Sequence, residues 1–324
     1  VKRGLRNPDG TGVLAGITNV SSVIGYDRTE DGAIVPIPGR LVYRGIDIDT
    51  LAAEADNHDR FLFEEVVWLL LFGSLPDRDQ HARFCKLLES HRELPRGFAD
   101  DMILNSPSPN LMNKMARSVL AMYSYDEHAE DLSLANILRQ SINLIAELPT
   151  MMVNAYQIKR RVYDRASMYF HLPTEGQSTA EHILSTYRAD QKFTHEEARL
   201  LDLCLLVHAD HGGGNCSTFT CRVLSSSGTD TYAAISAAIG ALKGPKHGGA
   251  NLKVMHQLDY IFAERGKPPR RRRSAGVPAQ DPAQGGRGRQ RPDLRHGACG
   301  VHRQRPPGAD PEKPRPPHGL REGL

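Results

Sequence analysis

The feature that most constrains this chain is a break in composition near Gly266. From Gly266 to Leu324 the sequence has 12 Arg, 11 Pro and 10 Gly, but no Ile, Met, Phe, Tyr or Trp. Such a segment lacks the apolar surface that offsets the entropy of ordering a chain. We therefore expect a disordered tail over residues 267–324, behind a body that is long enough for a substantial core.

Charge divides at the same position. The tail has 12 Arg and 2 Lys against 3 Asp and 2 Glu, or +9, whereas the whole chain carries +3, so the body carries −6. The run Arg270–Arg273 suits nucleic acid in charge, but no aromatic residues are interleaved with it. A solvated basic tail is the simpler interpretation, and nucleic-acid binding is not expected.

Cysteine usage and hydropathy indicate the compartment. The five cysteines are scattered, form no C-x-x-C pair and are odd in number, as in a reduced cytoplasmic protein. The N-terminus VKRGLRNPDG has no apolar signal-peptide core. The longest apolar run, VVWLLLF, is too short to span a membrane. We expect a cytoplasmic protein with no membrane partner.

The first half of the body changes from turn-rich to helical. Residues 1–51 are rich in Gly, Val and turn residues, which favours loops and short strands. The stretch FEEVVWLLLFGSLP, from Phe63, is typical of a buried helix that Gly73 and Pro76 end. Without a G-x-G-x-x-G motif, a P-loop or a βαβ alternation, the fold class is mainly α.

Helical patterns continue to the compositional break. A helix is expected over 133–165, and THEEARLLDLCLLVHAD begins with a capping box of Thr194 and Glu197. DTYAAISAAIGALKG runs to a stop at Gly244, and its small residues suit close helix packing. ANLKVMHQLDYIFAE, from about Ala250, repeats apolar residues at helical spacing.

Two glycine-rich loops between these helices concentrate the side chains suited to chemistry. In HADHGGGNCS the relevant residues are His208, Asp210, His211, Gly212, Gly213 and Asn215. In LKGPKHGGAN they are Lys243, Lys246, His247, Gly248, Gly249 and Asn251. Glycine-rich turns beside a helix bring backbone N–H groups and an imidazole to one place.

His247 is the strongest catalytic candidate. It precedes the helix expected from about Ala250, and the positive end of a helix dipole disfavours the imidazolium. A neutral imidazole can donate a hydrogen bond to a carbonyl that is about to become an enolate. A helix cap or an ordinary loop histidine is the simpler alternative for His247.

A metal site is a second alternative for the first loop. It would use the nearby histidines and cysteines, namely His208, His211, Cys204 and Cys216. Their spacing matches no standard zinc pattern, so no metal is expected.

Taken together, these residues resemble the citrate synthase family. HADHGGGNCSTFTCRVLSSSGTDTYAAISAAIGALKGPKHGGAN is similar to the family's most distinctive segment almost without gaps. RGLRNPDGTGVLAGIT, LVYRGIDIDTLA and FEEVVWLLLFGSLP resemble its N-terminal part in order and spacing. The resemblance covers about Val1–Glu264 and is closest to the bacterial citrate/2-methylcitrate synthases.

The resemblance implies a two-domain, nearly all-α homodimer with the active site in the cleft between the domains. Residues 1–248 would be the large-domain portion and 249–266 the start of the small domain. The implied reaction condenses oxaloacetate with acetyl-CoA to citrate and CoA, without a metal or cofactor. A 2-methylcitrate synthase that uses propionyl-CoA is the alternative.

The resemblance also implies roles for individual residues. By position, His247 matches the histidine that polarises the acetyl carbonyl, and His211 matches a histidine that binds oxaloacetate. We assign Asn215 to the same substrate site. The glycines that shape the two loops would be Gly212, Gly213, Gly248 and Gly249.

One expected family motif is missing from the chain. The family places a third histidine and an arginine in a G-H-x-V-Y…D-P-R segment beyond residue 266. Degenerate codons for Asp293–Gly308, read one base later, permit I-Y-G-M-G-H-A-V-Y-T-A-S-D-P-R. A long ordered run of matches is hard to obtain by chance. We infer a one-base displacement between about Glu264 and Arg273, which makes the tail an out-of-frame translation.

The displacement predicts that the polypeptide as written is inactive. The family's aspartate base and its dicarboxylate-binding arginines are absent, and catalytic groups that act as a unit are strongly non-additive. The apolar faces of the last helices would lack partners. A non-catalytic binding fragment with a basic, nucleic-acid-binding tail is the alternative of a different class.

Overall fold

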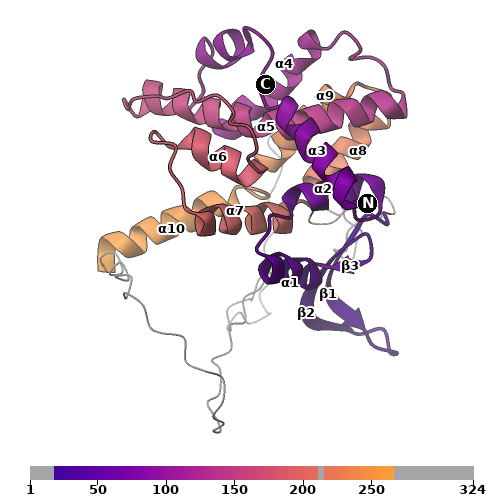
Figure 1. The fold of residues 1–324 in the computed structure, drawn as a ribbon. Helices are drawn as coiled ribbons and strands as arrows, with labels where there is room; N and C mark the ends of the chain where they lie inside the picture. Colours follow the sequence, from indigo (N-terminus) through magenta and orange to yellow (C-terminus); the bar gives the residue numbers. More distant parts are fainter. Residues whose placement is uncertain (1–17, 211–214, 266–324) are drawn as a thin grey trace, which may run out of the picture. The chain divides into compact units, whose positions relative to one another are not determined.

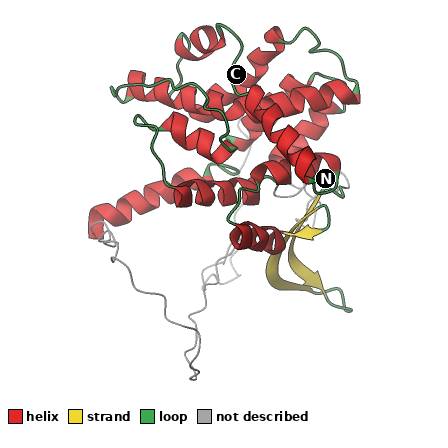
Figure 2. Cartoon of the chain, in the orientation of Figure 1, coloured by secondary structure: helices red, strands yellow, loops and turns green. Residues whose placement is uncertain are grey.

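The computed structural model describes residues 18–210 and 215–265. All of them lie in one unit of the chain, Val1–Val277. Helices dominate this described part (Figure 2), which confirms the mainly α fold class. The predicted tail lies outside the described residues.

A small antiparallel sheet forms where the turn-rich sequence predicted short strands. The strands β1 (Ser21–Arg28), β2 (Ile34–Tyr43) and β3 (Ile46–Asp47) are neighbours in that order. The register places Ser21 opposite Tyr43. The base of this hairpin is therefore the part that faces the helical body, because Ser21 and Tyr43 are its buried residues.

The expectation of loops and strands up to Leu51 is wrong at its end, because α1 (Ile48–His58) begins earlier. The side chain of Asp47 accepts a hydrogen bond from the N–H of Asp49. An aspartate at this position satisfies an N–H group that has no partner within the helix, so it favours a helix start. The prediction had overlooked this cap.

The predicted buried helix is α2 (Phe63–Phe72), and it ends where expected. Gly73 follows it with φ of 90°, a left-handed conformation that favours glycine. After it, α3 (Arg78–Ser90) starts with a capping box formed by Asp77 and Gln80. Both helices share a core with α5 (Leu134–Tyr163), which includes Val67, Phe84, Leu88 and Ile142.

The largest core forms around α5. Here α5 packs with α4 (Leu111–Met122) and α9 (Thr231–Leu242), and the three lie side by side (Figure 1). The π-helix η1 (Ala99–Leu104) and the short η2 (Tyr123–Tyr125) adjoin them. Their fully buried side chains include Phe98, Ile103, Val119 and Met151.

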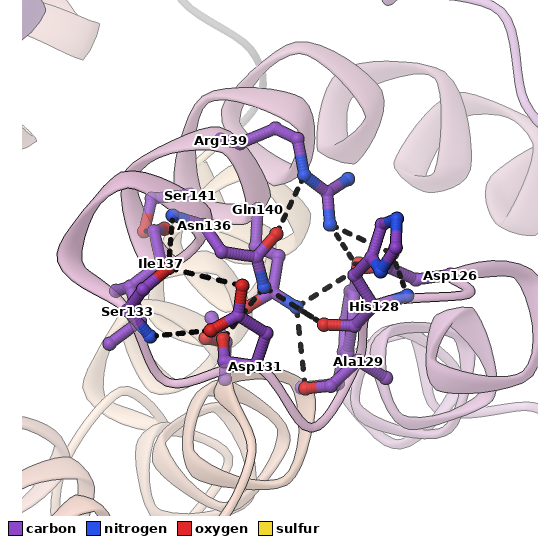
Figure 3. A network of polar contacts seen from close by, with 12 residues as sticks. Asp126, His128, Ala129, Asp131, Ser133, Asn136, Ile137, Arg139, Gln140 and Ser141 are labelled. Atoms are coloured by element: carbon purple, nitrogen blue, oxygen red, sulfur yellow. Dashed lines mark hydrogen bonds and ion pairs between the residues drawn. The ribbon is translucent and has the colours of Figure 1, made fainter.

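A polar network fastens the start of α5 (Figure 3). Asp126 accepts hydrogen bonds from Arg139 at 2.7 Å, from Gln140 at 2.9 Å and from the Tyr232 hydroxyl at 2.8 Å. Burial alone would raise the pKa of Asp126, but these hydrogen bonds outweigh it and hold the pKa well below its usual value. Tyr232 belongs to α9, so the network joins α9 to α5.

The remaining helices are α6 (Thr179–Tyr187), α7 (His195–His208), α8 (Cys216–Ser225) and α10 (Ala250–Arg265). The capping box at Thr194 is confirmed, and α10 begins where predicted. The helix α9 ends at Leu242 rather than running to Gly244, because Lys243 caps it. No helix in the described ranges is long and apolar enough to cross a membrane.

The last described helix, α10, buries almost nothing. From Asn251 to Arg265 every residue is exposed except the half-buried Phe262. Leu252 is 61% exposed and Met255 is 55% exposed. The apolar repeat predicted for this helix is present, but the described part of the chain does not cover it.

Candidate active site

The first glycine-rich loop is anchored by the sheet. Tyr43 is fully buried, and its hydroxyl lies 3.0 Å from the Leu206 carbonyl oxygen and accepts the N–H of Asp210 at 3.2 Å. Burial raises the pKa of Tyr43, so its hydroxyl keeps its proton. The end of α7, where the loop begins, is therefore held against β2.

A second contact from the sheet reaches the same loop. The Ser21 hydroxyl donates to a carboxylate oxygen of Asp210 at 2.5 Å. Asp210 was singled out in the sequence as a possible chemical group, but this contact gives it a structural use. The sequence analysis missed Tyr43 and Ser21, because their partners are more than 160 residues away.

Asn215 forms the start of α8. Its side-chain oxygen accepts the N–H of Thr218 at 2.9 Å, and its amide nitrogen donates to the Thr218 hydroxyl at 2.8 Å. This geometry is that of a helix N-cap. The predicted substrate contact of Asn215 stays a prediction. His211, Gly212 and Gly213 lie outside the described residues.

The second loop folds tightly back on the end of α9. The N–H of Gly248 donates to the Leu242 carbonyl at 3.0 Å. A Cβ atom at Gly248 would lie 2.5 Å from that oxygen, and one at Gly249 would lie 2.6 Å from the Cα of Pro245. Glycine is needed at both positions because the backbone approaches so closely. This turn holds His247 three residues before α10.

His247 joins the two loops. Its Nε2 atom lies 2.6 Å from the hydroxyl of Ser217, and Ser217 is the residue after the first residue of α8. The contact orients the half-buried imidazole of His247 at the start of α10 and beside the start of α8. No pattern in the sequence had identified Ser217, although its place directly after the first loop is a usable signal. Lys243, Lys246 and Asn251 are exposed nearby.

The histidine and cysteines proposed as an alternative metal site are spread apart. The His208 ring bonds the carbonyl of Cys204 through Nδ1 at 2.7 Å, within its own helix. Cys204 and Cys216 are free and exposed. Among the described residues no group of three or more His, Cys, Asp or Glu side chains is placed to hold a metal ion.

Comparison with known proteins assigns the family. Residues 9–275 match the family described as citrate synthase, C-terminal domain. The chain belongs to the citrate synthase family. It is 35% identical over 229 residues to a citrate synthase of Haloferax volcanii, across 69% of this chain and 56% of that protein. It is 34% identical to 2-methylcitrate synthase 2 of Corynebacterium glutamicum, across 72% of this chain and 58% of that protein. The matched part therefore spans little more than half of these relatives.

Solved citrate synthases share the fold. The enzyme of Pyrobaculum aerophilum superposes with a TM-score of 0.63 at 27% identity, covering 79% of this chain and 61% of that one. Citrate synthase of Thermoplasma acidophilum, solved as a ternary complex with carboxymethyl coenzyme A and oxaloacetate, has the same TM-score at 23% identity. It covers 78% of this chain and 60% of its own.

Proposed function

We propose that this chain carries part of the active site of a citrate synthase that condenses oxaloacetate with acetyl-CoA. The observation that carries the proposal is the 2.6 Å contact between His247 Nε2 and the Ser217 hydroxyl. It brings together the two glycine-rich loops on which the family resemblance rests. Membership of the family supports a condensing transferase.

In this proposal His247 polarises the acetyl carbonyl and stabilises the enol, with Ser217 orienting its ring. His211 and Asn215 bind oxaloacetate. Gly212 and Gly213 shape the first loop, and Gly248 and Gly249 shape the second. No metal or cofactor takes part. Residues 1–248 form the large-domain portion and 249–266 the start of the small domain.

The polypeptide as written is proposed to be inactive, because residues 267–324 are an out-of-frame translation. Two findings support this proposal. The relatives match only 69% and 72% of the chain, and α10 presents apolar side chains without a cover. The aspartate base and the arginines of the family have no counterpart before residue 266.

The decisive test starts with the coding DNA from the codon of Leu258 to that of Arg295. We expect a base whose insertion or removal opens a frame that encodes G-H-A-V-Y. Release of CoA thiol from acetyl-CoA and oxaloacetate is then measured for the chain as written and for the frame-restored chain. Turnover by the chain as written would overturn its inactivity. A frame-restored chain with no condensation activity would overturn the proposed reaction.

The acyl substrate is proposed to be acetyl-CoA. Relatives named for both reactions have nearly equal identity, 35% and 34%, so the test compares both thioesters. In the frame-restored chain, kcat/KM is expected to be higher with acetyl-CoA than with propionyl-CoA. The reverse order would identify a 2-methylcitrate synthase.

The intact protein is proposed to be a cytoplasmic homodimer. The resemblance to the family supports this state. Sedimentation of the frame-restored chain is expected to give twice the mass of one chain. A monomer that is active would contradict the proposed assembly.

A further inference from the structure

A cavity of about 270 Å³ lies between α2, α3 and α5, which contribute no residue to the candidate active site. Its apolar lining consists of Trp68, Phe72, Phe84, Leu87 and Ile142. Phe72 is 43% exposed and Leu87 is 40% exposed, so the cavity opens to solvent at these residues. We call it the Trp68 groove.

Aromatic rings form the wall of the Trp68 groove. The ring centroids of Trp68 and Phe72 are 4.2 Å apart, and Phe84 meets Trp68 edge-on at 5.5 Å. Phe84 is buried in the core shared by the three helices, so the wall has a firm base. Exposed apolar surface of this kind marks a binding site more often than an ordinary surface does.

The polar lining is a single available cation. Gln80 and Arg83 are the polar residues of the groove. The Gln80 side-chain oxygen accepts the N–H of Asp77 at 2.9 Å, so it is used in the cap of α3. Arg83 is exposed and makes no hydrogen bond or ion pair with any residue in the described ranges. No carboxylate lines the groove.

We propose that the Trp68 groove binds a medium-chain fatty acid. The guanidinium of Arg83 pairs with the carboxylate, because its planar fork matches two carboxylate oxygens. The aromatic wall covers the hydrocarbon chain. One cation without a neighbouring acid suits a ligand with one negative charge.

The size of the groove favours a small ligand over a second copy of the chain. Its volume is near the lower end of the roughly 300–1,000 Å³ typical of small-molecule sites. A stable protein interface needs roughly 20–30 residues on each side, whereas seven residues line this groove. A short acyl chain is the occupant that fits both the volume and the charge.

The chain has one tryptophan, so fluorescence of Trp68 reports on this site alone. Titration with decanoate below its micelle concentration is expected to give a saturable change. Arg83→Gln should weaken decanoate binding by about tenfold, the loss of a charge-assisted hydrogen bond. Arg78→Gln is the matched control, because Arg78 is exposed on the same helix but does not line the groove. Decanol lacks the charge and should bind both variants equally.

Leu87→Asp is a second variant, which places a negative charge at the rim and should abolish the decanoate signal. Circular dichroism checks that each variant keeps the helical content of the parent chain. Three results would overturn the proposal: no saturable change with decanoate, an equal loss in Arg78→Gln and Arg83→Gln, or a Trp68 signal set only by protein concentration. The last result would indicate a second copy of the chain on the groove.

Discussion

Two helices of this chain, α5 and α10, have similar apolar patterns and opposite surroundings. In α5, which has 30 residues, 12 are buried, including Met151 at 0% exposure. In α10, which has 16 residues, the described side chains are exposed apart from the half-buried Phe262. Met255 of α10 is 55% exposed.

The difference shows that an apolar repeat specifies a helix but does not supply its partner. Most of the stability of a protein helix comes from packing of its apolar face rather than from propensity. The helix α5 is surrounded by α3, α4, α6 and α9. The missing cover of α10 is what an out-of-frame continuation would produce, and four sets of variants test the contrast.

The largest effect is expected from removing a methionine side chain in α5. Met151→Ala leaves a cavity in the main core and should lower the free energy of unfolding by about 2–5 kcal/mol. The matched change Met255→Ala should alter it by less than about 0.5 kcal/mol, because an exposed side chain loses little. Urea unfolding followed by circular dichroism measures both. Equal losses would mean that α10 is packed, against the comparison.

The next effect tests the polar network at the start of α5. Asp126→Asn removes a charge that accepts hydrogen bonds from Arg139, Gln140 and Tyr232. The expected loss is about 1.5–3 kcal/mol at neutral pH. Because the pKa of Asp126 is lowered in the folded state, its contribution is present above the unfolded pKa of about 4 and is lost as the pH falls further. Thermal unfolding from pH 6 to pH 2 should show the two proteins converging. Parallel curves would contradict this role.

A second charged residue of α5 gives the opposite dependence on pH. Burial, and then the charge of Asp126, raises the pKa of Glu147 from 4.5 to about 8, and its Oε2 atom has no hydrogen-bond partner among the described residues. The folded state therefore binds a proton that the unfolded state releases, so stability falls as the pH rises from 4.5 to 8. Glu147→Gln should remove this slope and stabilise the protein by on the order of 1–2 kcal/mol at pH 8.

Glu264→Gln is the control for that experiment, since Glu264 lies on the exposed α10. It should leave the dependence of stability on pH as in the parent chain. Thermal unfolding at several pH values between 4.5 and 8.5 measures all three proteins. A parent chain whose stability is flat over this interval would show that Glu147 is not buried as described.

The smallest effect separates the tight loop from a helix surface. Gly248→Ala should destabilise the loop by about 1 kcal/mol or more, because its Cβ would meet the Leu242 carbonyl. In α9, Gly240→Ala finds open space and should stabilise by about 0.5–1 kcal/mol through helix propensity. Chemical denaturation of the two variants gives the sign of each. If both were stabilising, the loop would not hold His247 by this turn.

Local signals in the sequence determined much of this protein. The capping box at Thr194, the stop at Gly73, the start of α10 and the mainly α class were all predicted, because they depend on residues within about one helical turn. The two glycine-rich loops and their family were predicted from motifs of adjacent residues. The cap of α1 at Asp47 was also local, but it was overlooked.

Only the tertiary structure decided which of these elements meet. The contact of Ser217 with His247 spans 30 residues, and that of Tyr43 with Asp210 spans 167. Such pairs depend on the paths of the helices between them, which local patterns do not specify. The same reason separates α5 from α10. Each sequence predicts a helix, but burial needs partner surfaces from elsewhere in the chain, and the described residues supply them to α5 alone.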